Sequence, residues 1–283
     1  MFQNDVRKGL MAASMLAFAT PMMAQTTQPT TQPATTRPAT QPATRAATQP
    51  TRHPFAASIE KTHGMEAWES KDFLRGDMVV DFGGKTIIDG SFTMTPSMGE
   101  VVIEQNAGPT VTYIDGKSWV TPNADAFPRA RFHVLTWPYF LAAPFKLQDP
   151  GTKLEPMEDM PYNGVDYETA KLSFGAGVGD APEDWYILYK HPEYDRLDAM
   201  AYIVTYSKPQ EEAEKKPHAI VYEDYQVVDG VPLPMTWKFY NWSEEQSIYG
   251  DPIGEVTLSS LSFLPARKAE IEPPEDGEKV GAP

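Results

Sequence analysis

The chain has 283 residues, no cysteine, and 39 acidic against 24 basic side chains, which gives a formal net charge of −15. The absence of cysteine excludes disulfides, thiol catalysis and thiolate metal sites. Residues 1–24 carry +1 and residues 25–54 carry +3, so −19 remains for the rest of the chain. A domain this acidic repels phosphate backbones, and we therefore expect no nucleic-acid partner.

Residues 1–24 have the three parts of a signal peptide. Arg7 and Lys8 supply the positive start, a short apolar stretch follows, and a cleavage region ends at Ala24. Cleavage after Ala19 is the alternative. The apolar stretch is short compared with the roughly 20 residues that span a bilayer. We therefore expect an exported, periplasmic protein whose mature form has no transmembrane helix and no lipidated cysteine.

Residues 25–54 consist almost wholly of Thr, Gln, Pro, Ala and Arg. Such a tract cannot build a core, so it is predicted to be a disordered, semi-stiff spacer. Residues 55–265 have the composition of a folded domain, and this length is enough for a core that needs no disulfides. Residues 266–283 are charged and rich in Glu and Pro, and they are predicted to form a flexible tail.

The domain begins with a helical pattern over residues 56–70, and a break is predicted at Gly64. Apolar residues then alternate with polar ones in short segments, as in strands with one buried face. Gly83-Gly84, Asp115-Gly116 and Asp229-Gly230 indicate hairpin turns. The segments with strand character lie around residues 78–82, 88–94, 101–103, 111–114, 117–120, 165–174, 185–190, 197–207, 219–228, 235–240 and 255–263.

Residues 131–145 differ from these strands because large apolar side chains crowd together there. Pro138 and Pro144 are predicted to bracket a short helix in this insertion, which we expect to cover the mouth of the sheet. About ten consecutive strands joined by short turns, with no strand–helix–strand alternation, predict a mainly β fold. The expected architecture is an antiparallel meander that curls into an open or closed barrel.

Aromatic and methionine side chains are plentiful, with 13 Tyr, 13 Phe, 6 Trp and 13 Met. An ordinary core explains most of them, but the cluster from Trp137 to Leu141 also fits a lid over a concave, mostly apolar site. Lid packing without a cavity is the alternative. The candidate cavity or lid residues are Trp137, Tyr139, Phe140, Met78, Val80, Phe82, Met235, Trp237 and Phe239. Arg129 and Arg131 are candidates for the rim, where a guanidinium would meet an anionic head group.

Catalytic signatures are missing from the sequence, which has no Gly-rich phosphate loop, no GxSxG serine elbow and no HExxH motif. His63 and Glu66 lie three residues apart on one predicted helix face, but no further metal ligand accompanies them. We therefore assign no catalytic or metal-binding residue, and we expect no cofactor.

Several motifs are similar to those of the lipoprotein-localisation superfamily, which includes the outer-membrane lipoprotein carriers LolA and LolB. The motifs are His63-Gly64, Glu66-Ala67-Trp68, the turn from Tyr113 to Lys117, and the turn from Asp229 to Pro234 that precedes Trp237. The resemblance covers about residues 56–264. It implies a half-open antiparallel barrel of about eleven strands, helices over its mouth, and a cavity for acyl chains. It also implies an arginine that latches the lid, for which Arg129 and Arg131 are the candidates.

Three hypotheses of function follow from the sequence. The first is a monomeric periplasmic module that binds a lipid, acyl chain or other hydrophobic small molecule in a barrel cavity, with a role in envelope lipid or lipoprotein transport. The second is a structural or interaction domain with a filled core, which would have an envelope protein as its partner. The third is an enzyme on the same scaffold, and a buried polar cluster would favour it.

Overall fold

The computed structural model describes residues 52–282. The predicted signal peptide over residues 1–24 lies outside this part of the chain, as does the predicted spacer up to residue 51. Within the described residues, no helix combines the length and the apolar character needed to cross a membrane.

A single antiparallel sheet dominates the fold, and it has 14 strands within residues 52–282. Their order is β14-β5-β4-β3-β2-β1-β13-β12-β11-β10-β9-β8-β6, and β7 pairs with β8. The strands are β1 (Phe73–Phe82), β2 (Lys85–Met94), β3 (Glu100–Gln105), β4 (Thr110–Ile114), β5 (Lys117–Thr121), β6 (Thr152–Pro156), β7 (Met160–Tyr162), β8 (Val165–Phe174), β9 (Trp185–Lys190), β10 (Leu197–Tyr202), β11 (His218–Val228), β12 (Val231–Ser243), β13 (Ser247–Leu264) and β14 (Glu278–Val280).

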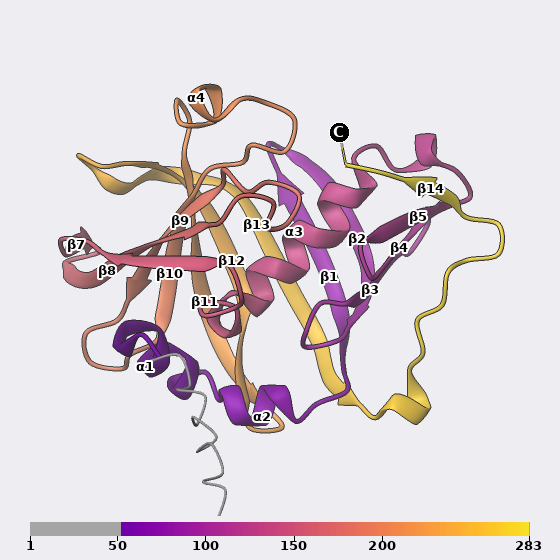
Figure 1. Cartoon of the computed structure of the whole chain (residues 1–283), viewed down its shortest axis with the longest axis horizontal. Coiled ribbons are helices and arrows are strands. Elements are labelled where there is room, and N and C mark those ends of the chain that lie inside the picture. The colour runs from indigo at the N-terminus through magenta and orange to yellow at the C-terminus, as the bar shows by residue number, and fades with distance from the viewer. Residues whose placement is uncertain (1–51, 283) are drawn as a thin grey trace, which may run out of the picture. The chain divides into compact units, whose positions relative to one another are not determined.

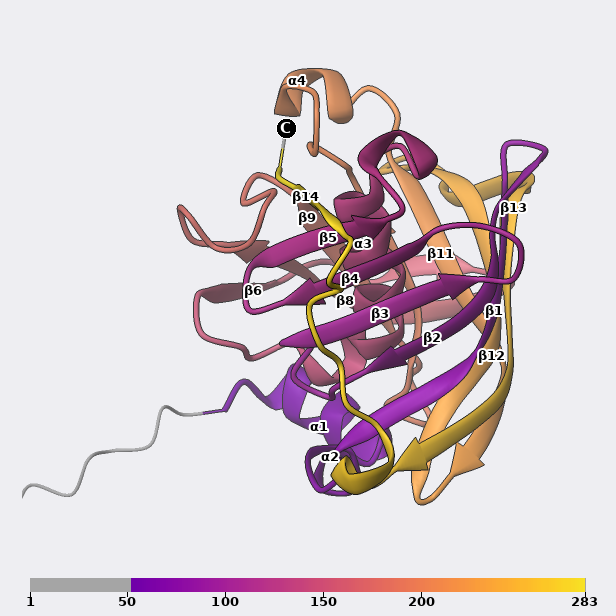
Figure 2. The same ribbon diagram turned by 90° about the vertical axis from the view of Figure 1, so that its right-hand side faces the viewer.

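The sheet consists of two meanders, β1–β5 and β8–β13, in which each strand pairs with the next. Strands β1 and β13 pair antiparallel and join the two meanders. The outermost strands, β14 and β6, do not pair with each other, so the sheet curls without closing (Figures 1 and 2). The mainly β, half-open antiparallel barrel that the sequence predicts is therefore confirmed.

The three predicted hairpin turns are confirmed, and each has two successive residues with positive φ. The φ values are 61° and 76° at Gly83-Gly84, 44° and 83° at Asp115-Gly116, and 46° and 87° at Asp229-Gly230. Two-residue turns of this kind match the twist of the strands that they join. Asn163-Gly164 makes a fourth such turn, between β7 and β8, which we did not predict.

Strands β6, β7 and β14 are additions to the predicted set. Each has only three to five residues, too few to show a clear alternation of apolar and polar side chains. Strand β14 lies within residues 266–283 and pairs with β5, where Glu278 is opposite Val120. Part of the predicted tail is thus a strand of the sheet, while the flexibility of the tail stays a prediction.

The strands curve strongly, and Gly90 in β2 allows one close approach between them. Gly90 pairs with Met78 on one side and with Gln105 on the other. A Cβ atom at this position would lie 2.1 Å from the carbonyl oxygen of Glu104, closer than any real side chain could lie. Glycine is therefore required where β2 meets β3.

Helix α3 (Ala130–Ala142) crosses the concave side of the sheet, and α1 (Pro54–Thr62) and α2 (Met65–Glu69) lie at one end of it (Figure 1). The predicted break at Gly64, between α1 and α2, is confirmed, with φ of 75°. The remaining helical segments are α4 (Gln210–Ala213) and the 3-10 turns η1 (Ala124–Ala126), η2 (Ala143–Phe145) and η3 (Ala266–Lys268).

The prediction that Pro138 bounds the helix was wrong, because Pro138 lies inside α3. Proline has no N–H to donate to the preceding turn, which costs about 3 kcal/mol in a helix interior. Nine of the 13 residues of α3 are buried, Trp137 and Phe140 among them. Burial of these side chains outweighs the cost of the proline, and the helix continues to Ala142.

The main core lies between α3 and the concave face of the sheet. Trp237 and Phe239 of β12 and Met78 and Val80 of β1 are all buried there, as the alternation in the sequence predicts. A second, smaller core covers the outer face of the second meander, around Tyr189. Strands β9 and β10 are therefore buried on both faces.

Candidate functional site

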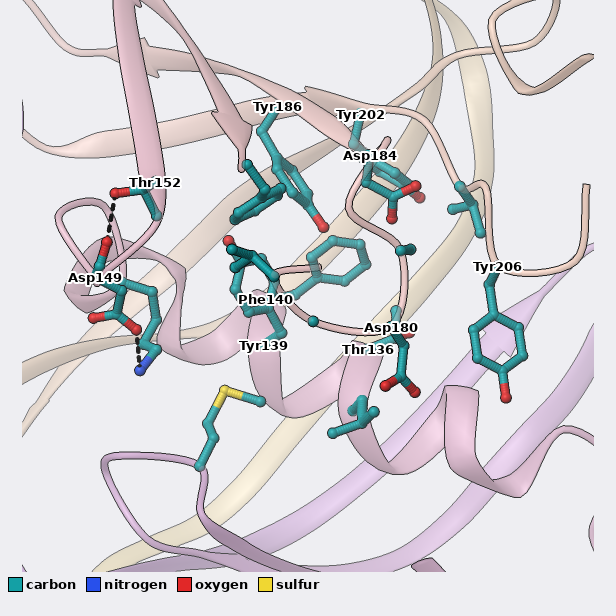
Figure 3. A pocket seen from close by; sticks show the side chains of 18 of the residues that line it. Thr136, Tyr139, Phe140, Asp149, Thr152, Asp180, Asp184, Tyr186, Tyr202 and Tyr206 are labelled. Carbon is teal, nitrogen blue, oxygen red and sulfur yellow. Dashed lines mark hydrogen bonds and ion pairs between the residues drawn. The ribbon is translucent and has the colours of Figure 1, made fainter. Parts of the chain in front are cut away.

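A cavity of about 320 Å³ lies between α3 and the second meander, and we refer to it as the aromatic pocket. Figure 3 shows Tyr186, Tyr202 and Asp184 on one side of it and Tyr139 and Phe140 of α3 on the other. The lining residues are Met98, Phe132, Leu135, Thr136, Tyr139, Phe140, Lys146, Asp149, Pro150, Thr152, Phe174, Val178, Gly179, Asp180, Ala181, Asp184, Tyr186, Tyr202, Val204 and Tyr206.

One face of α3 supplies a wall of the aromatic pocket. Phe132, Leu135, Thr136 and Tyr139 recur at intervals of three and four residues, which places them on one side of a helix. Phe140 lies at the edge of this face, and its ring centroid is 5.0 Å from that of Tyr202. The helix thus presents a mainly apolar face to the cavity, interrupted by the hydroxyls of Thr136 and Tyr139.

Strands β9 and β10 supply the opposite wall. Tyr186 and Tyr202 are directly opposite each other in the antiparallel pair, and their rings stack with centroids 6.4 Å apart. The Tyr139 ring lies 5.4 Å from Tyr186, and the Phe174 ring lies 6.0 Å from it. Ring contacts therefore connect the wall that α3 supplies with the wall that β9 and β10 supply.

Three tyrosine hydroxyls of the pocket have no hydrogen-bond partner among residues 52–282. They belong to Tyr139, Tyr186 and Tyr202, and only 8% of Tyr186 and 5% of Tyr202 is exposed. Burial raises the pKa of each of these phenols above its usual value, so the hydroxyls stay neutral. None of the three hydroxyl oxygens is a fully buried atom without a partner, so each of them is accessible from the space of the pocket. These hydroxyls are therefore free to bind a ligand group in the pocket.

Three carboxylates also line the pocket. Asp149 forms an ion pair with Lys146 at 2.5 Å, and Asp180 forms one with Arg131 at 2.5 Å. Asp184 instead accepts hydrogen bonds from Thr205, 2.7 Å from its backbone N and 2.8 Å from its Oγ1. Burial raises the pKa of Asp184 to about 6, and the hydrogen bonds from Thr205 oppose this shift.

Arg131 connects both meanders to the start of α3. Its Nε and Nη2 atoms donate to the two carboxylate oxygens of Asp180, at 2.5 and 2.8 Å. Its Nη1 atom donates to the carbonyl oxygen of Gly116 and to Oγ of Ser118, at 3.0 and 3.1 Å. The hydrogen bond with Asp180 raises the pKa of this guanidinium further. Such a two-pronged, charge-assisted contact is a strong one.

Tyr139 and Phe140 are the two predicted cavity residues that line the pocket. Arg129 and Arg131, the predicted rim residues, lie beside it. Arg129 places its guanidinium over the rings of Phe132 and Tyr206, 4.3 and 5.7 Å from their centroids.

The other seven predicted cavity residues lie in or against the main core, on the far side of α3 from the pocket. The Trp137 ring is 6.0 Å from the Phe239 ring, and its Nε1 donates to Nδ1 of His133 at 3.2 Å. These seven are Trp137, Met78, Val80, Trp237 and Phe239, which are buried, and Phe82 and Met235, which are half-buried. Their contact with a ligand stays a prediction, and it would require this core to open.

No sequence pattern singled out the pocket residues Tyr186, Tyr202 and Tyr206, and Asp184 stood out only as half of the acidic pair Glu183-Asp184. One signal was present, since residues 185–190 are apolar at nearly every position, as in a strand covered on both faces. That signal indicates burial on both sides but does not show which side holds a cavity.

A second, more open groove of about 550 Å³ adjoins the aromatic pocket and shares Lys146 and Asp149 with it. Its floor includes Trp68 and Phe145, whose rings stack at 4.3 Å. The ion pair between Lys146 and Asp149 therefore lies where the two hollows meet.

His63, considered above as half of a metal site, is a core residue. Its ring is buried, and its Nε2 accepts a hydrogen bond from the backbone N of Leu197 at 3.1 Å. Burial lowers its pKa to about 3, so it is neutral at physiological pH. Glu66 is exposed to solvent. Within the described residues, no group of three or more His, Asp or Glu side chains is placed to hold a metal ion.

No family model matches the sequence, and no curated protein matches it. Among solved structures, a LolA superfamily protein from Nitrosomonas europaea is similar, with 11% identity and a TM-score of 0.47 over 75% of this chain and 96% of that chain. A structure described as an outer membrane lipoprotein-sorting protein domain from Vibrio parahaemolyticus is also similar. It has 9% identity and a TM-score of 0.44 over 74% of this chain and 91% of that chain.

A DUF1329 family protein from Desulfovibrio piger has 10% identity and a TM-score of 0.45, over 75% of this chain and 94% of that chain. At these identities and TM-scores, no ligand or activity of this chain follows from the similarity. One of these similar structures is named as a LolA superfamily protein, the group whose motifs the sequence resembles.

Proposed function

We propose that this protein binds a hydrophobic small molecule or acyl chain in the aromatic pocket. The main support for this proposal is a cavity of about 320 Å³ with many aromatic side chains in its walls. Three tyrosine hydroxyls without hydrogen-bond partners face into it. Pockets for small ligands span about 300–1,000 Å³ and combine apolar walls with a few polar groups. The aromatic pocket has both properties.

Burial of an acyl chain would supply enough free energy for useful affinity. Each buried methylene contributes about 0.8 kcal/mol, so a chain of about ten methylenes contributes near 8 kcal/mol. The loss of translational freedom and the ordering of side chains reduce this gain. A micromolar dissociation constant corresponds to a binding free energy of about −8 kcal/mol. A chain of this length reaches that affinity when a few polar contacts offset the costs of ordering.

We further propose that the protein acts after export, in the periplasm, where it takes part in envelope lipid or lipoprotein transport. The support is the signal-peptide pattern of residues 1–24 and the spacer composition of residues 25–54. The intact mass of the protein recovered from the periplasm tests this. A mature chain that begins at or near Gln25 is expected, and a chain that retains residue 1 would contradict export with cleavage.

The binding proposal is tested with a fluorescent acyl probe that has an uncharged head and a chain of ten carbons. Thr136 projects from α3 into the pocket, so Thr136→Phe would fill part of the cavity with a ring. Thr257 lies on the solvent-exposed face of β13, and Thr257→Phe adds the same ring away from the pocket. We expect saturable binding by the wild type and the control, and at least tenfold weaker binding by Thr136→Phe.

The alternative of a structural or interaction domain rests on the filled core on the other side of α3, where Trp137 contacts Phe239. That hypothesis would replace the binding proposal if the wild-type protein showed no saturable uptake of the probe. Equal binding by the wild type, Thr136→Phe and Thr257→Phe would place the ligand outside the aromatic pocket.

A further inference from the structure

The aromatic pocket contains one carboxylate without an ionic partner. Asp149 and Asp180 are neutralised by Lys146 and Arg131. Asp184 has no ion pair within 4 Å among the described side chains, and its hydrogen bonds come from the backbone and hydroxyl of Thr205. These neutral donors do not cancel its charge. A negative charge therefore faces a largely apolar cavity.

The groups around Asp184 are suited to a cation. The rings of Tyr186 and Tyr202 lie near it in Figure 3, and their hydroxyls have no partner within residues 52–282. Aromatic faces attract ammonium groups, and phenol oxygens accept hydrogen bonds from them. An ammonium group would thus find a carboxylate, ring faces and two acceptors within one side of the pocket.

The other charges near this side of the pocket do not reverse the preference for a cation at Asp184. Lys208 attracts the Asp184 carboxylate at longer range, and Glu183 repels it. The guanidinium of Arg129 lies over the rings of Phe132 and Tyr206, and that of Arg131 binds Asp180. Neither rim arginine contacts Asp184 in the structure. The anionic head group expected from the sequence would therefore meet an unpaired carboxylate.

Building on the proposed function, we propose that the ligand of the aromatic pocket is a cationic amphiphile, with an apolar chain between α3 and β9–β10 and an amine or ammonium head at Asp184. The chain accounts for the apolar walls, and the head accounts for the unpaired carboxylate and the free tyrosine hydroxyls. An anionic amphiphile of the same length would place like charges close together in a poorly solvated site.

The protonation behaviour of Asp184 agrees with this assignment. Burial raises its pKa to about 6, so most molecules carry the charge at pH 7.5 although burial opposes it. A bound ammonium group would lower this pKa again, since an opposite charge favours the ionised carboxylate. Ligand binding and deprotonation of Asp184 are thus coupled.

The experiment compares three probes with the same ten-carbon chain: decyltrimethylammonium, 1-decanol and decanoate. Dissociation constants are measured by calorimetry at pH 7.5 in 150 mM salt, below the concentration at which each probe aggregates. For the wild type we expect decyltrimethylammonium to bind at least tenfold more tightly than decanoate, with 1-decanol between them. Salt at this concentration screens the general acidity of the domain.

Two variants separate Asp184 from the general charge of the protein. Asp184→Asn keeps the oxygen that accepts from Thr205 and removes the charge, and it should bring the ratio of cation to anion affinity within threefold. Asp251→Asn removes a charge from an exposed position in β13 and should leave the ratio unchanged. Binding of 1-decanol should be the same in all three proteins, which also shows that the pocket is intact.

Equal or tighter binding of decanoate by the wild type would overturn the assignment of a cationic ligand. The same conclusion would follow if Asp184→Asn kept the full preference for the cation. These outcomes would leave hydrophobic binding itself in place, because 1-decanol still reports it. If none of the three probes bound saturably, the proposed function would fail, and this inference with it.

Discussion

The two sides of α3 face the same sheet but differ in how they are packed. On one side, Trp137 contacts Phe239 in a buried core that also contains Trp237. On the other side, Tyr139 and Phe132 border a cavity that contains carboxylates and free hydroxyls. The comparison separates two uses of aromatic residues. Abundant aromatic side chains in the sequence indicate both a core and a binding site, and their hydrogen-bond partners and charged neighbours distinguish the two.

The filled side should carry the larger share of stability, and Trp237→Ala tests this most strongly. Trp237 is fully buried, and truncation of such a side chain costs about 3–5 kcal/mol. Urea unfolding measures the change. Tyr249→Ala, at an aromatic residue with 39% exposure, is the matched control and should cost less than about 1 kcal/mol. A loss below about 1 kcal/mol for Trp237→Ala would contradict its place in the core.

Arg131 connects the two sides, and its removal should have the next largest effect. Arg131→Ala leaves the half-buried Asp180 without its partner, which costs about 3 kcal/mol of unfolding free energy. Arg75 forms an exposed ion pair with Glu104 at 3.8 Å, so Arg75→Ala should cost less than about 1 kcal/mol. If both variants lost the same small amount, the connection through Arg131 would be unimportant for stability.

The hollow side should contain a group that destabilises the fold at neutral pH. The pKa of Asp184 is about 6 in the folded state and near 3.8 when unfolded, so the folded state binds its proton more tightly. The stabilisation that comes from this more tightly bound proton is fully present below about pH 4. It is lost as the pH rises from about 4 to 6, and it is absent at higher pH. A shift of about 2 units, reduced for partial solvation, corresponds to about 2 kcal/mol.

Asp184→Asn should therefore be more stable than the wild type by about 2 kcal/mol at pH 8, and the difference should nearly vanish at pH 4. Urea unfolding of both proteins at the two pH values measures it. Burial also lowers the pKa values of His63 and His133, to about 3 and 4, which destabilises both proteins equally at pH 4. A difference between the two proteins that did not change with pH would show that Asp184 is not desolvated.

The smallest expected effect is the difference in stability loss between two Tyr→Phe variants. One variant removes a hydroxyl that donates a hydrogen bond within the fold, and the other removes a hydroxyl without such a partner. Tyr222 donates its hydroxyl hydrogen to the carbonyl oxygen of Phe140 at 2.7 Å, so Tyr222→Phe should cost about 1 kcal/mol. Tyr202 has no such partner within the described residues, so Tyr202→Phe should cost less than about 0.5 kcal/mol. Equal losses in urea unfolding would mean that the Tyr202 hydroxyl also has a structural partner.

Local patterns in the sequence were enough to predict much of the sheet. Strands β8 and β9 have the bounds that the sequence predicts, residues 165–174 and 185–190. The turns at Asp115-Gly116 and Asp229-Gly230 were equally clear, because a tight hairpin needs two residues that accept positive φ. Such features depend on a few neighbouring residues, and these are adjacent in the chain.

Other features depended on partners far away in the chain. The pairing of β1 with β13 joins segments separated by almost the whole domain, and no local pattern specifies it. Helix α3 continues through Pro138 because contacts with distant strands outweigh a local penalty. Strand β14 has only three residues and is defined by its pairing with β5.

The sequence by itself determined that this is a mainly β chain with an acidic domain, and which face of strands such as β12 is apolar. The tertiary structure alone decided which side of α3 is filled and which is hollow. Alternation along a strand records that a side chain avoids water, but it does not record whether a neighbour fills the space opposite. That depends on how α3, β9 and the loop at Asp180 pack together, and these segments meet only in the folded protein.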